Sequence, residues 1–399
     1  MTLANTESRY GSVTKTFHWL TALLILTVIP LGIIANGLPY ETAEQQAQKA
    51  WLFSLHKTVG VPIFFVALAR ILWAITQPKP GLLHPDRRLE SWAAETVHWL
   101  LYGSLLLVPL SGWIQHSATT GFAPIWWPFG QYLPFVPKDE GLANLFAGLH
   151  MVLERVLVIA LVLHIAGALK HHFVDKDTPL KRMWFGWANV PETFADHKMT
   201  VPFVSALAAW AVAIFIGSSL GMYNKTSGAV EAAQLQEVQS DWQVQDGTLG
   251  LTISQLGSAV EGSFADWTAA ITFDETIQTG PAGKVEVTVS IGSLTLGAVT
   301  NDALGADYFN AEAFPTATFT ADIEALEAGY VASGTLTIKE DTMPVDLPFD
   351  LTVEAGLASM TGTLTLDRRD FNIGNSQTDE GSLGFGVDVG VNLTARRPE

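Results

Sequence analysis

The chain has 399 residues, of which 48% are hydrophobic and 15% charged, with no cysteine and a formal net charge of −17. Without cysteine it can form no disulfide, thiolate metal site, iron–sulfur cluster or covalent c-type haem attachment. The charge is divided unevenly: residues 231–399 hold 26 acidic and 6 basic side chains, a net of −20, whereas the first 230 residues carry +3. So acidic a second half argues against nucleic acid as a partner.

The first half contains five apolar stretches, each close to the roughly 20 residues that cross a bilayer as a helix. They cover residues 17–35, 54–75, 96–114, 145–169 and 201–222. Five buried helices of a water-soluble protein would need far more polar surface than these segments offer. The sequence therefore predicts an all-α transmembrane four-helix bundle plus a fifth membrane helix.

The basic residues between these stretches predict the orientation of the bundle. Lysine and arginine gather at the N-terminus, in the second connection and after the fourth stretch, whereas the first and third connections carry one each, Lys49 and Lys138. Because basic connections stay on the cytoplasmic side, we expect a cytoplasmic N-terminus in a multi-pass protein of the bacterial inner membrane. Everything after Tyr223 would then lie in the periplasm.

Five of the ten histidines lie in or at the ends of the apolar stretches: His18, His56, His98, His150 and His164. His150 and His164 are 14 residues apart, which is about four helical turns and roughly 21 Å of rise, so both face one seam of the bundle. The predicted topology puts His56 at the level of His150, near the outer surface, and His18 at the level of His164, near the inner one. The sequence therefore predicts two stacked sites, each with two imidazoles.

Two imidazoles on opposite sides of a flat ring suit axial ligation of haem iron, whereas zinc would require a third or fourth ligand at the same level. Histidines that only pack or relay protons are the alternative. His98 competes with its neighbours as a ligand of the inner site. Arg70, 14 residues beyond His56, suits a haem propionate or a quinone headgroup, and Arg155 could act similarly near the outer surface. Both arginines could instead extend to the membrane interface.

Residues 8–187 resemble the bacterial di-haem cytochrome b561 family. The motifs that carry the resemblance are Phe17-His18-Trp19-Leu20, Leu55-His56-Lys57, His98-x-x-x-Tyr102, Gly148-Leu149-His150, Leu163-His164, Lys170-His171-His172-Phe173 and Asp177-Thr178-Pro179-Leu180-Lys181-Arg182-Met183. The resemblance implies two b-type haems with His18, His56, His150 and His164 as iron ligands, and electron exchange with ubiquinone. Some members of the family are superoxide oxidases. The tandem His171-His172 belongs to the motif but lies beyond the predicted bilayer, and we do not assign it as a ligand.

After a polar linker at residues 224–239, the hydrophobic period changes from helical to two. Val285, Val287, Val289 and Ile291 alternate with polar residues, and similar alternation covers residues 317–323, 349–353, 364–366 and 387–393. Such strands, separated by Gly and Asp turns, predict a one-sided antiparallel sheet closed on itself, an all-β lipocalin-like barrel. Alternation does not distinguish a solid core from an interior that encloses a ligand.

Residues 240–396 resemble a YceI-type domain, a lipocalin-like barrel that holds polyisoprenoid chains such as ubiquinone or isoprenyl phosphate. The motifs include Gly262-Ser263-Phe264-Ala265-Asp266-Trp267, Phe314-Pro315-Thr316-Ala317-Thr318-Phe319 and Arg369-Asp370-Phe371-Asn372-Ile373. Lys339-Glu340 stands where many members have a histidine, and Thr248 replaces another frequent polar residue. This half has no histidine and no catalytic constellation, so we expect a binding module.

Together these features predict four segments: a cytochrome b561-like di-haem domain at 8–190, a fifth transmembrane helix at 200–223, a linker at 224–239 and a YceI-like barrel at 240–397. The expected activity is that of an oxidoreductase that moves electrons between a periplasmic donor, superoxide by resemblance, and ubiquinone. No catalytic side chain is assigned. The alternatives are a quinol-oxidising conduit to a periplasmic redox partner and a membrane-anchored isoprenoid carrier.

Overall fold

The computed structural model describes residues 2–7, 9–39, 42–82, 84, 86–176, 178–185, 200–223 and 231–397. The chain divides into a helical unit within residues 1–225 and a β-rich unit from residue 226 onward, which also includes the short segments 39–50 and 120–124. Five long apolar helices followed by a curled antiparallel sheet confirm the predicted fold class. Residues 186–190 of the first predicted segment, 224–230 of the linker and Asp177 of the motif lie outside the described residues.

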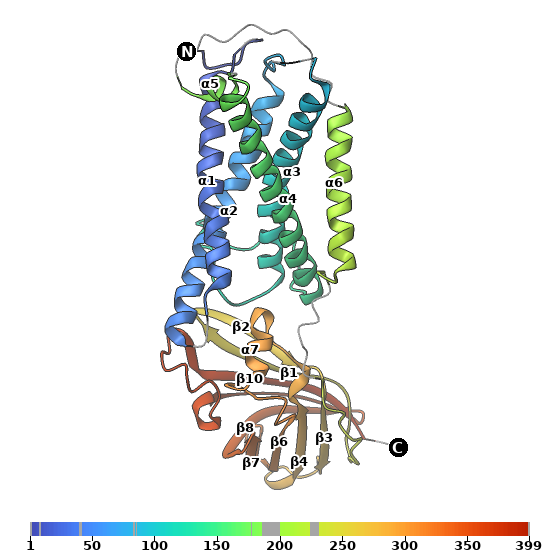
Figure 1. Cartoon of the computed structure of the whole chain (residues 1–399). Coiled ribbons are helices and arrows are strands. Elements are labelled where there is room, and N and C mark those ends of the chain that lie inside the picture. The colour runs from blue at the N-terminus through green and yellow to red at the C-terminus, as the bar shows by residue number, and fades with distance from the viewer. Residues whose placement is uncertain are drawn as a thin grey trace. The chain divides into compact units, whose positions relative to one another are not determined.

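Five helices are long and apolar enough to cross a membrane (Figure 1): α1 (Ser12–Gly37), α2 (Ala43–Ile75), α3 (Arg88–Ala118), α4 (Glu140–Phe173) and α6 (Thr200–Ser219). A short α5 (Pro179–Met183) follows α4. The helices extend beyond the predicted stretches because good helix formers flank them. The first turns of α2, for example, are polar and rich in Ala, Glu and Gln.

The helical unit has a thin core and an apolar outer surface. One cluster, built around Ile25, Ile63 and Leu105, joins α1, α2 and α3, while a second joins α3 to α4. Many large apolar side chains point outward, and Phe215 of α6 is 72% exposed. Such a surface suits lipid rather than water.

Small residues let α6 approach its neighbours closely. A Cβ on Gly103 of α3 would collide with the ring of Trp210, and one on Gly148 of α4 would collide with the backbone of Met222. Trp210 Nε1 donates to Ser104 Oγ at 3.2 Å. Close packing through small residues, with polar contacts between helices, is typical of membrane helices.

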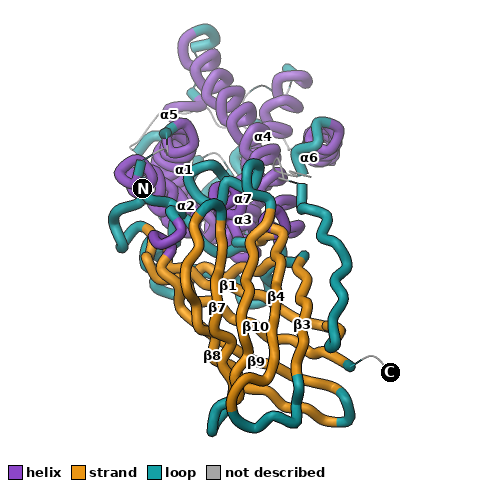
Figure 2. The backbone as a smooth tube through the Cα atoms, turned by 90° about the horizontal axis from the view of Figure 1, so that it is seen from below, coloured by secondary structure: helices purple, strands orange, loops and turns teal. Residues whose placement is uncertain are grey.

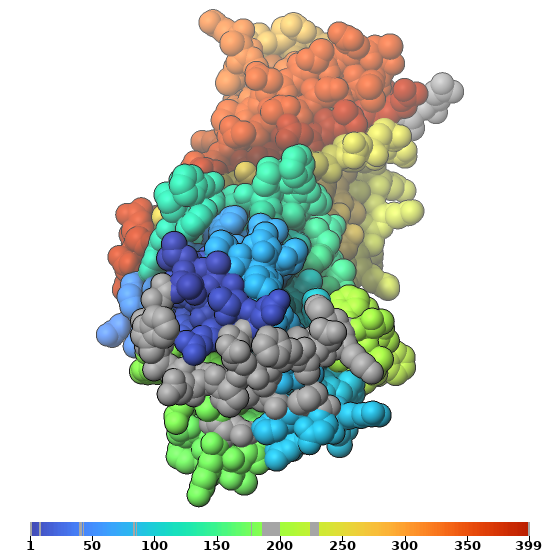
Figure 3. Space-filling model, turned by 90° about the horizontal axis from the view of Figure 1, so that it is seen from above, coloured from blue at the N-terminus to red at the C-terminus, as the bar shows by residue number. Residues whose placement is uncertain are grey.

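The N-terminal segment closes one end of the bundle, which Figure 3 views from above. Asn5 N donates to Gln77 Oε1 at 3.0 Å, and Gly81 N donates to the Glu7 carbonyl, so residues 2–7 lie on the connection after α2. Lys15 Nζ donates to the Trp184 carbonyl at 2.8 Å, which binds the segment after α5 to the same end.

The β-rich unit is one ten-stranded antiparallel sheet with the order β3-β4-β6-β7-β8-β9-β10-β1-β2-β5 (Figure 2). The strands are β1 (Gln243–Gln255), β2 (Ser258–Phe264), β3 (Trp267–Phe273), β4 (Gly280–Ser290), β5 (Leu294–Thr295), β6 (Thr316–Ala325), β7 (Tyr330–Ile338), β8 (Asp341–Glu354), β9 (Leu357–Asp367) and β10 (Leu383–Arg396). Short helical turns interrupt them at η1 (Ile291–Ser293), η2 (Gly297–Val299), α7 (Thr300–Leu304) and η3 (Arg368–Phe371).

The sheet curls so that the start of β1 approaches β3. Asp241 N donates to the Ile271 carbonyl at 2.9 Å, and Ile271 N donates to Ser240 Oγ at 2.8 Å. Among the described residues the strand ladder itself ends at β3 and β5. The predicted alternating segments lie in β4, β6, β8, β9 and β10, except that Ile291 belongs to η1, where the chain turns away from β4.

Candidate functional site

The structure brings four of the predicted histidines together as two pairs. The ring centroids of His56 and His150 are 6.3 Å apart, and those of His18 and His164 are 6.1 Å apart. A metal–imidazole nitrogen bond is about 2 Å long, so two imidazoles on opposite sides of one iron have centroids roughly 6 Å apart. Both pairs have the spacing of axial ligands, at two levels of the unbroken helix α4.

The His56–His150 pair is held in a tautomer that leaves Nε2 of each ring free to bind a metal. His56 Nδ1 lies 2.9 Å from the Val28 carbonyl, and His150 Nδ1 lies 2.8 Å from the Val108 carbonyl. Because a carbonyl oxygen can only accept, each Nδ1 carries the hydrogen and each Nε2 keeps a free lone pair. Metal-binding histidines almost always donate their second ring nitrogen in this way.

Two glycines make these contacts possible. A Cβ on Gly32 of α1 would lie 2.8 Å from His56 Cε1, and a Cβ on Gly112 of α3 would lie 3.0 Å from His150 Cε1. In both helices the glycine follows the accepting valine, Val28 or Val108, by four residues and therefore lies on the same helix face. α1 and α3 thus present the same surface, a carbonyl beside a bare backbone, to the histidines of α2 and α4.

The His18–His164 pair has different surroundings. Arg70 Nη2 lies 3.4 Å from His18 Nδ1, and its guanidinium stands over the ring of Tyr102 at 5.3 Å from the centroid. A guanidinium can only donate, and 3.4 Å is at the outer limit of a hydrogen bond. The pairing of Arg70 with a haem propionate or a quinone headgroup stays a prediction.

His98 and Arg155, the remaining sequence candidates, differ in position. The His98 ring centroid is 5.2 Å from that of His164, closer than the roughly 6 Å expected for two ligands on opposite sides of one iron. Arg155 is largely exposed and pairs with its neighbour Glu154 at 3.4 Å. His98 therefore lacks the spacing of the four paired histidines, and Arg155 already has a carboxylate partner.

A basic cluster joins the middle of α2 to the end of α3. Lys57, the residue after His56, has its Nζ 3.4 Å from Nδ1 of His116, a histidine of α3 that is 6% exposed. The His116 ring stacks on Tyr132, and Lys138 Nζ lies 3.7 Å from the centroid of that tyrosine ring. Tyr132 also lines an apolar groove of about 580 Å³ between α2, α3 and the connection that follows α3.

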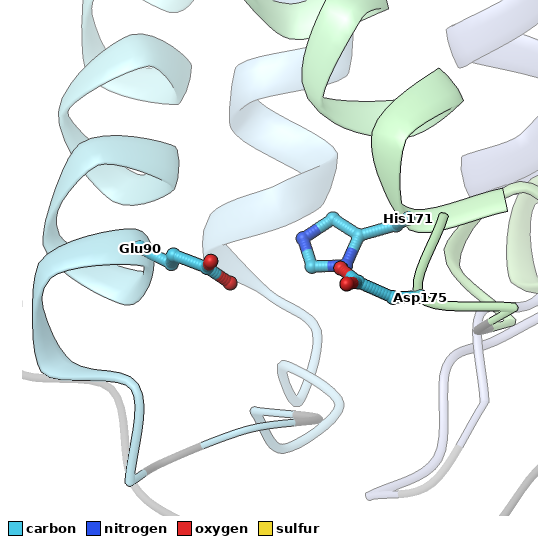
Figure 4. Close-up of side chains that lie close together, drawn as sticks. All are labelled: Glu90, His171 and Asp175. Carbon is cyan, nitrogen blue, oxygen red and sulfur yellow. The ribbon is translucent and has the colours of Figure 1, made fainter. Parts of the chain in front are cut away.

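Glu90, His171 and Asp175 lie close together where α3 begins and α4 ends (Figure 4). Lys170 Nζ is 2.7 Å from Glu90 and 2.9 Å from Asp175, and Arg87 contacts both carboxylates at 3.3 Å. Two cations therefore balance the two carboxylates, and Lys170 holds the pKa of Asp175 below its usual range. We interpret the cluster as an ion-pair network that joins α3 to α4; that His171 is not a haem ligand stays a prediction.

The interior of the β-rich unit is apolar but incompletely packed. The inward-facing residues of β8 alternate with exposed polar residues and prolines. Of the inward apolar residues only Leu347 is fully buried, while the others are half-buried: Met343, Val345, Phe349, Leu351 and Val353. The aromatic side chains of Trp242, Phe273, Tyr330 and Phe349 contact one another in series. The inward side chains of β8 thus remain partly exposed, which favours an interior that can accept an apolar ligand.

Sequence reasoning missed Gly32, Gly112 and His116. The Val-x-x-x-Gly spacing in α1 and α3, each with a proline between the two residues or directly after the valine, was the available signal for the two glycines. Its meaning depends on which histidine faces each helix, which only the packed bundle shows. His116 lies outside the resemblance motifs, so only its burial identifies it.

Comparisons with known proteins identify the helical unit. Residues 9–186 match the family model of prokaryotic cytochrome b561, and residues 237–395 match that of the YceI-like domain. The chain is 35% identical over 188 residues to cytochrome b561 homolog 2 of Escherichia coli (strain K12), a match that covers 46% of this chain and 95% of the relative. The chain belongs to the prokaryotic cytochrome b561 family.

Further similarities cover both halves of this cytochrome b561. The chain is 25% identical over 178 residues, 44% of its length, to 96% of a Yersinia pestis protein named probable superoxide oxidase CybB. The crystal structure of Burkholderia cenocepacia BcnA is 25% identical, with a TM-score of 0.35, and the match covers 37% of this chain and 95% of BcnA. Cytochromes b561 are electron-transfer proteins that bind haem b, and the paired imidazoles beside bare glycines fit such a group.

Proposed function

We propose that the chain is a di-haem membrane cytochrome that takes electrons from superoxide at its periplasmic face and passes them to ubiquinone. We further propose that its C-terminal barrel binds a quinone or another polyisoprenoid in the periplasm. One observation carries the proposal. Histidines at two levels of α4 each face a second histidine, and the distance between the two rings is that of axial haem ligands. The superoxide oxidase name of one relative supports the choice of donor.

In this proposal His56 and His150 hold one haem b, and His18 and His164 hold the other. Each haem, when bound, would supply a group that gains and loses one electron. The Val28 and Val108 carbonyls orient the imidazoles of the outer pair. Arg70 would pair with a propionate or a quinone headgroup on the inner side.

The proposed reaction balances in electrons and protons. Two superoxide anions each lose one electron and become O₂, while one ubiquinone gains two electrons and two protons and becomes ubiquinol. Lys57 and Lys138 lie near the outer histidine pair in the proposed topology, where their positive charge raises the local concentration of an anion.

The proposed arrangement in the membrane follows the basic connections. The cytochrome domain (8–190) and fifth helix (200–223) would lie in the bacterial inner membrane with a cytoplasmic N-terminus. The linker (224–239) would lead to a periplasmic barrel (240–397).

Stopped-flow mixing of the purified, haem-loaded full chain with superoxide tests the activity. We expect reduction of the haem absorption bands and, with a soluble ubiquinone present, one ubiquinol for every two superoxide anions consumed. His150→Ala and His164→Ala should each lose about half of the haem, whereas His171→Ala serves as the matched control and should keep all of it. Absence of haem reduction by superoxide in a fully loaded sample would exclude the proposed donor.

A second candidate is a quinol-oxidising conduit that delivers electrons to a basic periplasmic partner. The net charge of −20 on residues 231–399 favours it, because this charge attracts a cationic protein and repels superoxide at long range. Haem reduction by ubiquinol, combined with no reaction with superoxide, would select this function. A preparation that binds isoprenoid but never binds haem would instead indicate a carrier.

A further inference from the structure

One side chain of the barrel is buried without any partner. Gln377 lies in the loop between η3 and β10 and is 2% exposed, although its neighbours Ser376 and Thr378 are exposed. Neither its amide nitrogen nor its amide oxygen has a hydrogen-bond partner among the residues that the structure describes. Buried amides are rarely left unpaired in native proteins, and an unpaired one commonly marks the place of a missing water or ligand.

Arg368 fixes the loop that carries this amide. The guanidinium is 3% exposed, and its five N–H groups make five hydrogen bonds, all to main-chain carbonyls. One acceptor is the carbonyl of Gln377 itself, and two others belong to Leu383 and Gly384 at the start of β10. The backbone of Gln377 is therefore held in place by a rigid clamp.

The described basic residues of the barrel have few N–H groups left to bind an anionic ligand. Arg369 pairs with Asp367, Arg397 with Glu275 and Lys284 with Asp322, whereas Arg368 keeps its charge but has no N–H left to donate. Lys339 Nζ donates to the carbonyl of Asn372, whose amide in turn binds Asp341. The sixth base, Arg396, is exposed at the opposite end of β10 from Leu383, about 40 Å away along the strand.

We propose that the Gln377 amide is the specificity-determining polar contact of the barrel, and that it selects a neutral quinone headgroup over an isoprenyl phosphate. The amide nitrogen can donate to a quinone carbonyl, and the amide oxygen can accept from the hydroxyl of the reduced form. A diphosphate would need several cationic donors, but every N–H of Arg368 is already used, and the acidic side chains of residues 231–399 outnumber the basic ones by 26 to 6. The inference rests on the proposed function, in which the barrel binds a quinone or another polyisoprenoid.

Photolabelling of the full chain in detergent tests the inference, with a short-chain azidoubiquinone as probe and mass spectrometry to locate the label. We expect label both in the helical unit and in peptides from residues 240–396. Gln377→Leu should lower the barrel label about tenfold, the value of one good hydrogen bond, and leave the helical label unchanged. Gln278→Leu, the same change at an exposed loop position, is the matched control and should lower neither.

Competition and stability measurements distinguish the remaining outcomes. Decylubiquinone should displace the barrel label, whereas farnesyl diphosphate should not, and Lys339→Gln should have no effect. Gln377→Leu should also raise the melting temperature of the barrel, because it removes an unpaired buried amide. This gain shows that lost labelling does not come from unfolding.

Preferential displacement by farnesyl diphosphate, or barrel labelling that is unchanged in Gln377→Leu, would overturn the inference. Helical label without any barrel label would also overturn it, yet would leave the proposed haem reduction by superoxide standing, since that reaction is measured separately.

Discussion

At the scale of single residues, the candidate haem site depends on main-chain carbonyls and on glycines, not only on the side chains of the histidines. Two carbonyl oxygens hold His56 and His150, and two glycines provide the space beside their rings. The orientation of each imidazole is therefore settled before any metal binds, which reduces the entropy that binding must overcome.

Gly32→Ala should selectively weaken the His56–His150 site. The new methyl group would lie 2.8 Å from His56 Cε1 and 2.9 Å from Nδ1, so the ring must move away from the Val28 carbonyl. Such overpacking costs on the order of 1–3 kcal/mol. We expect loss of up to one of the two haems, measured as the haem-to-protein ratio by pyridine haemochrome.

Gly60→Ala is the matched control, because a Cβ at Gly60 of α2 meets nothing within 4 Å. Alanine also favours a helix by up to about 1 kcal/mol over glycine, so haem content should be unchanged or slightly higher. Equal haem loss in both variants would mean that the space beside His56 is not what matters.

The sequence predicts the four paired histidines because their relation is simple helix geometry. A spacing of 14 residues places His150 and His164 on one face of α4 whatever the rest of the bundle does. Gly32, Gly112 and Gln377 could not be predicted in this way, because each acquires its role from a group on another element. The choice between His18 and His98 as the partner of His164 also depends on the distance between ring centroids. This distance is 6.1 Å for His18 and 5.2 Å for His98, and no sequence pattern encodes the difference.

At the scale of elements, alternation predicts the strands well but not the edges of the sheet. Inward and outward residues must alternate along a half-buried strand, so β4, β6, β8, β9 and β10 are visible as patterns. The two-residue strand β5 and the turn η3 are too short for any period to identify. η3 is nevertheless important, because it contains Arg368, whose side chain binds the following loop at Gln377.

Acid should loosen η3. Hydrogen bonding from the Arg369 side chain holds the pKa of Asp367 at about 2, below its ordinary value of 3.8. Because the folded pKa is the lower one, the stabilisation is present above about pH 4 and is lost as the pH falls toward 2. We expect amide hydrogen exchange in residues 368–384, corrected for its intrinsic pH dependence, to be less protected at pH 3 than at pH 5. Asp367→Asn should lack this dependence, and an equal response in the variant would assign it to another group.

At the scale of the whole molecule, the two halves have opposite electrostatic characters. The first 230 residues carry +3, and the remainder carries −20. All four paired histidines and both accepting carbonyls belong to the first half. Haem binding should therefore be independent of the barrel. The rate at which a charged electron donor approaches should, in contrast, depend on the charge of the barrel.

A chain ending at Tyr223 tests this division. We expect the same haem content as in the full chain, with faster haem reduction by superoxide at low ionic strength, because the repelling charge is gone. The difference should shrink in about 1 M salt, where the screening length is about 3 Å. Slower reduction of the shortened chain at every salt concentration would show that the barrel contributes directly to the reaction.

The use of main-chain carbonyls to hold His56 and His150 has a consequence for how this protein can change over time. A substitution at Val28 or Val108 replaces the side chain but leaves the accepting oxygen in place. The outer site is thus insensitive to the identity of those two residues and sensitive to the gain of a single methyl group at Gly32 or Gly112. Among related sequences, different apolar residues that fill the same core space should be found at the two acceptors, whereas variation should be nearly absent at the two glycines.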